Sequence, residues 1–392
     1  MAEPLSIAGL REAARRRLPR AVFDFIDGGA QDECTLRANR ADFDALPLRP
    51  RVLVDVGVRD LRTTVLGRAV ALPLLVAPTG LTGLATPQGE LHARRAAAAL
   101  GTIYCLSTNA SCSIEAVAAA APGPFWFQLY AMRDRGLTRD LVQRARAAGC
   151  DALVLTVDLV QQGRRERDLR NGFTVPPRLS LRNALDMLRH GRWVLDQLRA
   201  PRLEFANYPS GADRGVVELA QLIAAQFDAT LTWDDLAALR DAFGGPLVLK
   251  GLLHPDDARR AVEHGVDAVI VSNHGGRQLD GACSAIAALP AIVAAVGGRA
   301  EVLLDGGVRR GADIVRALAL GARAVLVGRP VLWGLAALGP RGAEHALTIL
   351  RDELDHCLAL LGVPAVRALD AHCLHDPRAA PPVQAAARVA QT

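Results

Sequence analysis

The chain has 392 residues, is 51% hydrophobic and carries a formal net charge of +5, which allows one large domain or two ordinary ones. Its arginines are spread without a basic tract interleaved with aromatic residues, and it has no apolar run of about 18 residues, so neither nucleic-acid binding nor a transmembrane helix is indicated. Seven scattered cysteines without a CxxC pair favour a reduced, cytoplasmic protein, and we predict no metal site.

The first elements expected along the chain are two helices, over residues 5–17 and 22–30. Beyond them, eight short apolar runs each stop at a polar residue or a glycine, and helical patterns lie between them, for example over residues 89–100 and 255–264. Strands that are apolar on both faces and alternate with helices indicate a parallel sheet, and eight such units indicate a closed (β/α)8 TIM barrel. A doubly wound open sheet is disfavoured because the GxGxxG fingerprint is missing after the first strand. The apolar runs span residues 72–77, 102–106, 125–127, 152–155, 246–249, 266–271, 301–304 and 324–327.

One domain over residues 1–375 is predicted, with a disordered Pro- and Ala-rich tail over residues 376–392. The interval after the fourth strand is too long for one loop and one helix, so an insertion is expected over about residues 175–232. Within it, residues 178–202 are rich in arginine and carry apolar residues at helical spacing. This pattern fits either a lid over the barrel mouth or peripheral contact with the inner face of the cell membrane. Helices after residue 339 and over residues 352–361 are expected to pack on the outside of the barrel.

The loop after the sixth strand brings a base and a fixed cation to one strand end. Ser272, His274 and Arg277 follow this strand, and two glycines separate the last two of them. Glycine lets the backbone pass close to a ligand. An imidazole beside a guanidinium suits the removal of a proton from an anionic substrate.

Lys250 is the only lysine in the chain and ends the fifth strand, where its compact ammonium places a point charge. Neutral hydrogen-bonding groups at other strand ends suit the edge of a flat heteroaromatic ring, beside which Lys250 would stabilise the anion formed on reduction. Glycines and arginines after strands seven and eight suit a phosphate. Together these features predict FMN rather than a nicotinamide dinucleotide. The predicted ring contacts are Pro78, Thr79, Gly80, Ser107, Gln128, Thr156, Lys250 and Ser272, and the predicted phosphate contacts are Asp305, Gly306, Gly307, Arg309, Gly328 and Arg329.

The motifs at residues 128–130, 155–158, 163–166, 272–280 and 305–311 resemble those of the FMN-dependent α-hydroxy acid dehydrogenases and oxidases. The resemblance runs from about residue 5 to about residue 361 and is greatest to mandelate and lactate dehydrogenases and hydroxymandelate oxidases. It implies a flavoenzyme that oxidises a 2-hydroxy acid to the 2-oxo acid, with oxygen or a quinone as electron acceptor. Family members are often homotetramers, so we expect a homo-oligomer.

The resemblance also implies a role for each matching residue. His274 would take the proton of the substrate hydroxyl as hydride moves to flavin N5, and Asp158 would orient His274 and favour its protonated form. Lys250 would face flavin N1 and O2. The substrate would be bound by Tyr130 at its hydroxyl and by Arg165 and Arg277 at its carboxylate.

Two departures from the family pattern bear on the substrate. Phe25 stands where the family commonly has a tyrosine whose hydroxyl helps to bind the carboxylate, and residues 159–162 replace a Pro-Arg pair of the glycolate oxidases. We therefore expect an aryl-substituted, mandelate-like L- or S-2-hydroxy acid that packs against Phe25. L-lactate or another aliphatic 2-hydroxy acid is the alternative, and a non-redox, phosphate-binding barrel isomerase is the alternative of another class.

Overall fold

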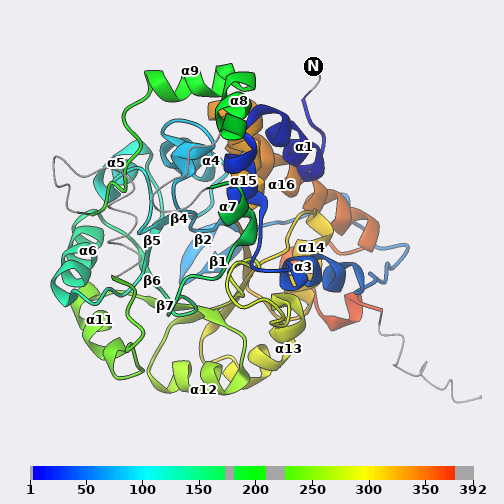
Figure 1. Ribbon diagram of the computed structural model, residues 1–392. Coiled ribbons are helices and arrows are strands. Elements are labelled where there is room, and N and C mark those ends of the chain that lie inside the picture. Colours follow the sequence, from blue (N-terminus) through cyan, green and yellow to red (C-terminus); the bar gives the residue numbers. More distant parts are fainter. Residues whose placement is uncertain (1–2, 173–180, 209–225, 376–392) are drawn as a thin grey trace, which may run out of the picture.

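The computed structural model describes residues 3–172, 181–208 and 226–375, and it confirms the predicted barrel (Figure 1). The parallel strands close on one another in the order β10-β3-β4-β5-β6-β7-β8-β9, so strands that follow one another in the chain are also neighbours in the sheet. Almost every residue of these strands is buried, which explains why the sequence shows apolar runs rather than alternation. The strands are β3 (Leu74–Val76), β4 (Tyr104–Ser107), β5 (Phe125–Leu129), β6 (Ala152–Thr156), β7 (Leu247–Leu252), β8 (Ala268–Val271), β9 (Glu301–Asp305) and β10 (Ala324–Val327).

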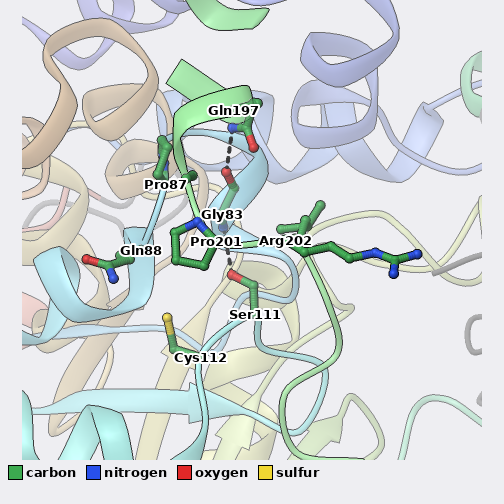
Figure 2. Close-up of a pocket in the computed structure, with 10 residues that line it drawn as sticks. Gly83, Pro87, Gln88, Ser111, Cys112, Gln197, Pro201 and Arg202 are labelled. Carbon is green, nitrogen blue, oxygen red and sulfur yellow. Dashed lines mark hydrogen bonds between the residues drawn. The ribbon is translucent and has the colours of Figure 1, made fainter. Parts of the chain in front are cut away.

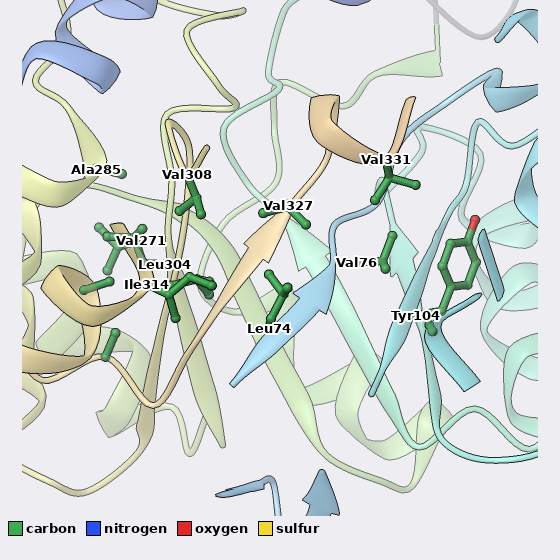
Figure 3. Packing of buried hydrophobic residues seen from close by; sticks show 14 of the residues in the cluster. Leu74, Val76, Tyr104, Val271, Ala285, Leu304, Val308, Ile314, Val327 and Val331 are labelled. Carbon is green, nitrogen blue, oxygen red and sulfur yellow. The ribbon is translucent and has the colours of Figure 1, made fainter. Parts of the chain in front are cut away.

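The two faces of each strand serve two different cores. Inward-facing side chains such as Leu75, Trp126 and Leu303 fill the barrel interior. Outward-facing side chains such as Leu74 and Val327 pack against the surrounding helices (Figure 3). The burial of both faces fixes the strand register, and with it the position of every residue at the carboxyl ends.

The helices form an outer ring around the strands (Figure 1). Both helices predicted at the start of the chain are present, and the two expected after residue 339 and over residues 352–361 are one continuous helix, α16. Helix α3 was not predicted, because its sequence is mostly polar and carries little apolar periodicity. The helices that cover the barrel are α1 (Ile7–Arg17), α2 (Arg20–Asp27), α3 (Cys34–Asp44), α4 (Gly89–Ala99), α5 (Ile114–Ala120), α6 (Arg135–Ala147), α11 (Asp235–Phe243), α12 (Pro255–Glu263), α13 (Ala285–Val296), α14 (Gly311–Ala319), α15 (Arg329–Leu338) and α16 (Gly342–Leu361).

A two-stranded hairpin that the sequence did not predict covers the amino end of the barrel. Its strands β1 (Thr63–Val65) and β2 (Arg68–Val70) pair antiparallel, and Val65 and Val70 join the apolar cluster of the barrel interior. The backbone N–H of Leu66, at the turn, donates to the Glu301 carboxylate at the start of β9. Ligands must therefore approach from the opposite end, where the strands finish.

The predicted insertion contains α8 (Leu181–Arg189) and α9 (Gly191–Arg199), and the short helix α7 (Glu166–Arg170) lies before its predicted start. Helix α9 is fixed to the short 3-10 helix η1 (Thr82–Leu84) that follows β3. Trp193 Nε1 donates to the Leu84 carbonyl at 2.9 Å. Gln197 Nε2 donates to the Gly83 carbonyl, also at 2.9 Å (Figure 2). Among the described residues, no helix is both long and apolar enough to cross a bilayer. The predicted tail and parts of the predicted insertion, residues 175–180 and 209–225, lie outside the described residues.

Candidate active site

An imidazole and a carboxylate meet above the carboxyl ends of β6 and β8. His274 Nδ1 lies 2.9 Å from Asp158 Oδ1, and the hydroxyl of Tyr130 lies 3.5 Å from His274 Nε2. A carboxylate acceptor at Nδ1 fixes the proton there and directs Nε2 toward Tyr130. Burial alone would raise the pKa of Asp158, but its interactions with His274 and with the Lys250 ammonium lower it below its ordinary value, so this carboxyl stays ionised. These three residues, to which the family resemblance assigns related roles, therefore lie close together at one end of the barrel.

The backbone places Asp158 and His274 by two unusual conformations. Gly251 has φ +111° at a bulge in β7, and a Cβ there would lie 2.7 Å from the Cβ of Asp158, so only glycine leaves room for the carboxylate. His274 itself has φ +58°, in the left-handed region of backbone conformation that residues other than glycine rarely adopt. The Ser272 hydroxyl supports this turn by accepting the backbone N–H of His274 at 3.0 Å. Strain of this kind persists only where the surroundings hold the residue in place.

Two guanidiniums face the same region from different elements. Arg277 Nη1 donates to the carbonyls of Phe25 and Gly28, at 2.8 and 3.0 Å. Arg165 Nε donates to Asp168 at 2.8 Å. The Phe25 ring lies against both, with its centroid 5.7 Å from the guanidinium carbon of Arg165 and 5.3 Å from that of Arg277. Burial, together with the charges of Arg165 and Arg329, holds the pKa of Arg277 well below its usual range, which marks a place where an anion is favoured.

Lys250 lies buried at the end of β7 between two partners. Its ammonium is 3.0 Å from Asp305 Oδ2 and donates to Ser272 Oγ at 2.9 Å. Burial alone would lower the pKa of Lys250, but the carboxylates of Asp305 and Asp158 outweigh it and raise the pKa. The only lysine of the chain is thus a fixed positive charge at the barrel mouth.

Several buried polar atoms around Lys250 have no hydrogen-bond partner among the described residues. They include Gln128 Nε2, Thr156 Oγ1 and Asp305 Oδ1, each at or near the carboxyl end of a strand. The register pairs Thr156 with Lys250, and Ser107 Oγ donates to Gln128 Oε1 at 3.1 Å. Buried donors and acceptors cost free energy unless a ligand satisfies them. Their arrangement along neighbouring strand ends fits the polar edge of the predicted flavin ring.

The residues predicted to bind phosphate come together after β9 and β10. Arg309 is half-buried, with its guanidinium carbon 4.8 Å from the Trp333 ring centroid. Burial and the charges of Arg329 and Arg40 lower the pKa of Arg309 to about 9. Helix α15 begins at Arg329, so its first N–H groups point toward the same end of the barrel. Two half-buried cations at a helix N-terminus suit a dianion.

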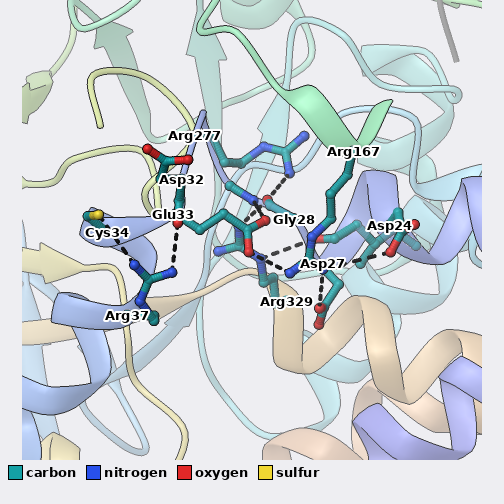
Figure 4. A network of polar contacts seen from close by, with 12 residues as sticks. Asp24, Asp27, Gly28, Asp32, Glu33, Cys34, Arg37, Arg167, Arg277 and Arg329 are labelled. Atoms are coloured by element: carbon teal, nitrogen blue, oxygen red, sulfur yellow. Dashed lines mark hydrogen bonds and ion pairs between the residues drawn. The ribbon is translucent and has the colours of Figure 1, made fainter. Parts of the chain in front are cut away.

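The guanidinium of Arg329 binds backbone carbonyls, a structural role that the sequence did not suggest. It donates to the carbonyls of Ile26, Gly28 and Gly275, at 3.0, 2.8 and 2.9 Å. These bonds belong to the polar network that joins the end of α2 to α7 and α15 (Figure 4). Any direct contact of Arg329 with a phosphate would therefore come mainly from its backbone N–H.

The loop after β3 holds the remaining predicted ring contacts, Pro78, Thr79 and Gly80. The Thr79 hydroxyl lies 3.1 Å from that of Thr82, and a Cβ at Gly328 would lie 3.2 Å from Thr79, so the ends of β3 and β10 are close. Buried Glu90, which sequence reasoning missed, anchors this loop. Its carboxylate accepts the backbone N–H groups of Thr82 and Ser111, at 3.0 and 2.8 Å. A lone glutamate on a predicted helix gives no signal of such a role.

Comparison with known proteins finds similar sequences along almost the whole chain. The sequence model of a family described as FMN-dependent dehydrogenase matches residues 14–376. An L-lactate oxidase of Nostoc sp. is 48% identical over 379 residues, covering 96% of this chain and 99% of the relative. An L-lactate dehydrogenase of Caulobacter vibrioides is 48% identical over 378 residues, covering 95% of this chain and 99% of the relative.

Solved structures of mandelate enzymes have the same fold. The crystal structure of (S)-mandelate dehydrogenase, described as a monotopic membrane protein, has a TM-score of 0.92 and 42% identity, over 95% of this chain and 100% of the other. A mandelate oxidase with (S)-4-hydroxymandelic acid has a TM-score of 0.82 and 43% identity, over 95% of this chain and 98% of the other.

Proposed function

Because the chain belongs to the FMN-dependent dehydrogenase family and is an FMN-dependent enzyme of 2-hydroxy acid oxidation, we propose that its substrate carries an aryl group next to the hydroxyl-bearing carbon. The product is then the corresponding aryl 2-oxo acid. The observation that carries this proposal is the Phe25 ring, which lies against both guanidiniums where a hydroxyl would otherwise assist them. Family membership also removes the alternative of a non-redox isomerase.

The surroundings of Tyr130 support an apolar substituent. A small cavity beside it is lined largely by apolar side chains, among them Leu159, Phe227 and Leu231. The rings of Tyr130 and Phe227 meet edge to face, with centroids 5.6 Å apart. An aromatic contact of this kind contributes about 0.5–1.5 kcal/mol beyond the burial of area. An aryl substituent on this side of Tyr130 would meet more apolar surface than a methyl group.

Different residues of the chain bind the substrate and transfer its proton. Arg165 and Arg277 bind the carboxylate, and Tyr130 hydrogen-bonds the substrate hydroxyl. His274 Nε2 then takes the hydroxyl proton, while Asp158 holds the opposite ring nitrogen 2.9 Å away and stabilises the imidazolium. Bound FMN supplies the two-electron oxidising capacity.

The predicted cofactor contacts fit FMN in chemistry. Gln128, Thr156 and Lys250 would satisfy the polar edge of the ring, since the first two carry unpartnered buried atoms among the described residues. Arg309 and the N-terminus of α15 would hold the phosphate.

A second candidate is oxidation of L-lactate or another aliphatic 2-hydroxy acid. It is favoured by the two relatives at 48% identity, both of which are L-lactate enzymes. Purified holoenzyme should be mixed anaerobically with mandelate, L-lactate and glycolate while the bleaching of flavin absorbance is followed. Fastest bleaching by mandelate supports the aryl proposal. Faster bleaching by L-lactate or glycolate contradicts the aryl proposal. If no 2-hydroxy acid bleaches the flavin absorbance, the assignment of the protein to 2-hydroxy acid oxidation is contradicted as well.

We also propose that the insertion docks on an anionic membrane surface. Helix α9 places Trp193 and Gln197 against the barrel, while Leu188 and Leu198, on α8 and α9, are 77% and 76% exposed. Arg189, beside these leucines, is exposed as well. Exposed leucines next to arginines are typical of helices that lie in a membrane interface. Such a position favours a quinone over oxygen as electron acceptor.

A further inference from the structure

We infer that Asp168 is a positioning residue for the substrate carboxylate, because it holds Arg165 by Nε and so turns the outer edge of that guanidinium toward the substrate. The inference rests on the proposed function, in which Arg165 binds the carboxylate. Arg165 is the N-cap residue of α7, and Asp168 lies in the first turn of the same helix. Arg165 Nε is 2.8 Å from Asp168 Oδ2, and the two side chains are 16% and 9% exposed.

A guanidinium presents its donors in a rigid planar fork. Once Nε is held by Asp168, the two terminal nitrogens remain to bind a carboxylate through two parallel hydrogen bonds. The Phe25 ring lies against the guanidinium with its centroid 5.7 Å away and limits rotation of its plane. Asp168 and Phe25 together therefore fix both the direction and the plane of Arg165.

The hydrogen-bond partners of Arg277 are neutral, unlike the charged partner of Arg165. Arg277 is held by two neutral carbonyls, those of Phe25 and Gly28, whereas Arg165 is held by a carboxylate. Asp168 thus contacts Arg165 directly and acts on Arg277 through its charge. Burial raises the pKa of Asp168, and the charges of Arg165 and Arg277 only partly offset that rise. Its charge also favours the ionised form of Arg277. Asp168 therefore balances two partly desolvated cations before the substrate arrives.

The experiment compares Asp168→Ala with Asp168→Asn in the holoenzyme. The alanine variant removes the acceptor, whereas the asparagine variant keeps an oxygen that can accept the Nε–H. Glu166→Gln is the matched control, because Glu166 lies on the same helix and pairs with Arg170 in an exposed ion pair. Steady-state kinetics are measured with mandelate and with its neutral primary amide, which lacks the carboxylate.

We expect Asp168→Ala to raise KM for mandelate about 10-fold or more while kcat changes little, because the lost interaction is made equally in the ground state and the transition state. KM for the amide should stay unchanged. Asp168→Asn should recover much of the loss, and Glu166→Gln should behave as the unchanged protein. Equal effects on mandelate and its amide, or a fall in kcat with constant KM, would show a merely structural role and overturn the inference.

A binding measurement separates this inference from the proposed function. Oxidised holoenzyme is titrated with phenylglyoxylate, and the perturbation of flavin absorbance gives Kd without turnover. Weaker binding to Asp168→Ala, with recovery in Asp168→Asn, supports the inference even if mandelate is not the best substrate. If Asp168→Ala does not fold with FMN, Asp168→Leu takes its place, because leucine fills similar space without an acceptor for the Nε–H. Unchanged Kd and KM in Asp168→Leu would then overturn the inference. A protein that no 2-hydroxy acid bleaches refutes the proposed function instead.

Discussion

Asn39 and Asn273 donate to each other's side-chain oxygens, 2.8 Å apart in both directions. Both side chains are buried, at 2% and 6% exposed. Asn39 lies on α3, and Asn273 immediately precedes His274 with its left-handed backbone. Asn273 also donates to the Cys283 carbonyl and accepts the N–H of Gly276, so the amide pair anchors both ends of the loop. An N-terminal helix thus holds the loop that carries His274 in its strained conformation.

Asn39→Ala should therefore lower both stability and activity. The substitution leaves the Asn273 amide partly unsatisfied in a buried place, which costs about 1–3 kcal/mol. Thermal unfolding of the holoenzyme and kcat with the best 2-hydroxy acid measure the two effects. A lower Tm with unchanged kcat would mean that the amide pair stabilises the fold without orienting His274.

Asp158→Asn should lower kcat about 100-fold or more, because general-base catalysis contributes about 10²–10⁴-fold and depends on the orientation and charge of the imidazole. The pKa of Asp158 is lowered, so lowering the pH from 7 to 5 does not protonate this carboxyl in the unsubstituted protein. The deficit of the variant should therefore be similar across this range. A deficit that disappears at pH 5 would contradict the assignment.

Asp27 should stabilise the protein in a pH-dependent way. Its carboxylate accepts two hydrogen bonds from Arg11, at 2.6 and 2.7 Å. Burial alone would raise the pKa of Asp27, but these bonds and the charges of Arg11, Arg329 and Arg167 lower it. A lowered carboxyl pKa gives stability that is complete above the unfolded value near 3.9 and is lost as the pH falls through the folded value.

Asp27→Asn should thus cost about 1.5–3 kcal/mol at pH 7, with a difference from the unsubstituted protein that shrinks below about pH 4. Unfolding measured between pH 3 and pH 7 tests this. Glu12→Gln, at a fully exposed carboxylate, is the control and should show little effect. A constant difference at every pH would argue against the ionised pair.

Phe25→Tyr should tighten the binding of small 2-hydroxy acids. The new hydroxyl would lie by the guanidiniums of Arg165 and Arg277, and a hydrogen bond to a charged group contributes about 1.5–3 kcal/mol. KM for L-lactate and glycolate should fall about 10-fold, and preference for mandelate should weaken. No change in KM for any 2-hydroxy acid would argue against the proposed role of Phe25.

Leu188→Ser together with Leu198→Ser should abolish co-sedimentation with anionic liposomes without changing Tm, because both side chains are largely exposed. Leu360→Ser, at an exposed leucine of α16, is the matched control and should still bind. A protein that never pellets with liposomes would leave only the lid function for the insertion.

The barrel was predictable because its signal is repeated and local. Each strand is a short apolar run that ends at a polar residue or a glycine. A polar residue at such a position, for example Gln128, Thr156 or Lys250, indicates contact with a ligand. The closed order of the strands then brings these ends together, as eight units require. The pairing of His274 with Asp158 was expected from the family resemblance, and the two side chains lie 2.9 Å apart although 116 residues separate them.

The missed features depend on contacts between distant segments. Asn39 lies on a mostly polar helix with few apolar residues. Nothing in the sequence of this helix therefore indicates the pair with Asn273. Arg329 follows a glycine at a strand end, which indicates phosphate binding, yet its guanidinium donates to three carbonyls. Asp168 looks like an ordinary helical carboxylate until Phe25 and Arg277, from other parts of the chain, are in place.

The solitary lysine has a practical consequence. Lys250 is the only side-chain amine in the protein, and its ammonium is 4% exposed and paired with Asp305. Acylating reagents such as succinimidyl esters will therefore find no reactive side-chain amine on the exterior. Any such adduct on a side chain would mark a molecule whose barrel mouth had opened, which gives a chemical reporter of local unfolding that needs no introduced probe.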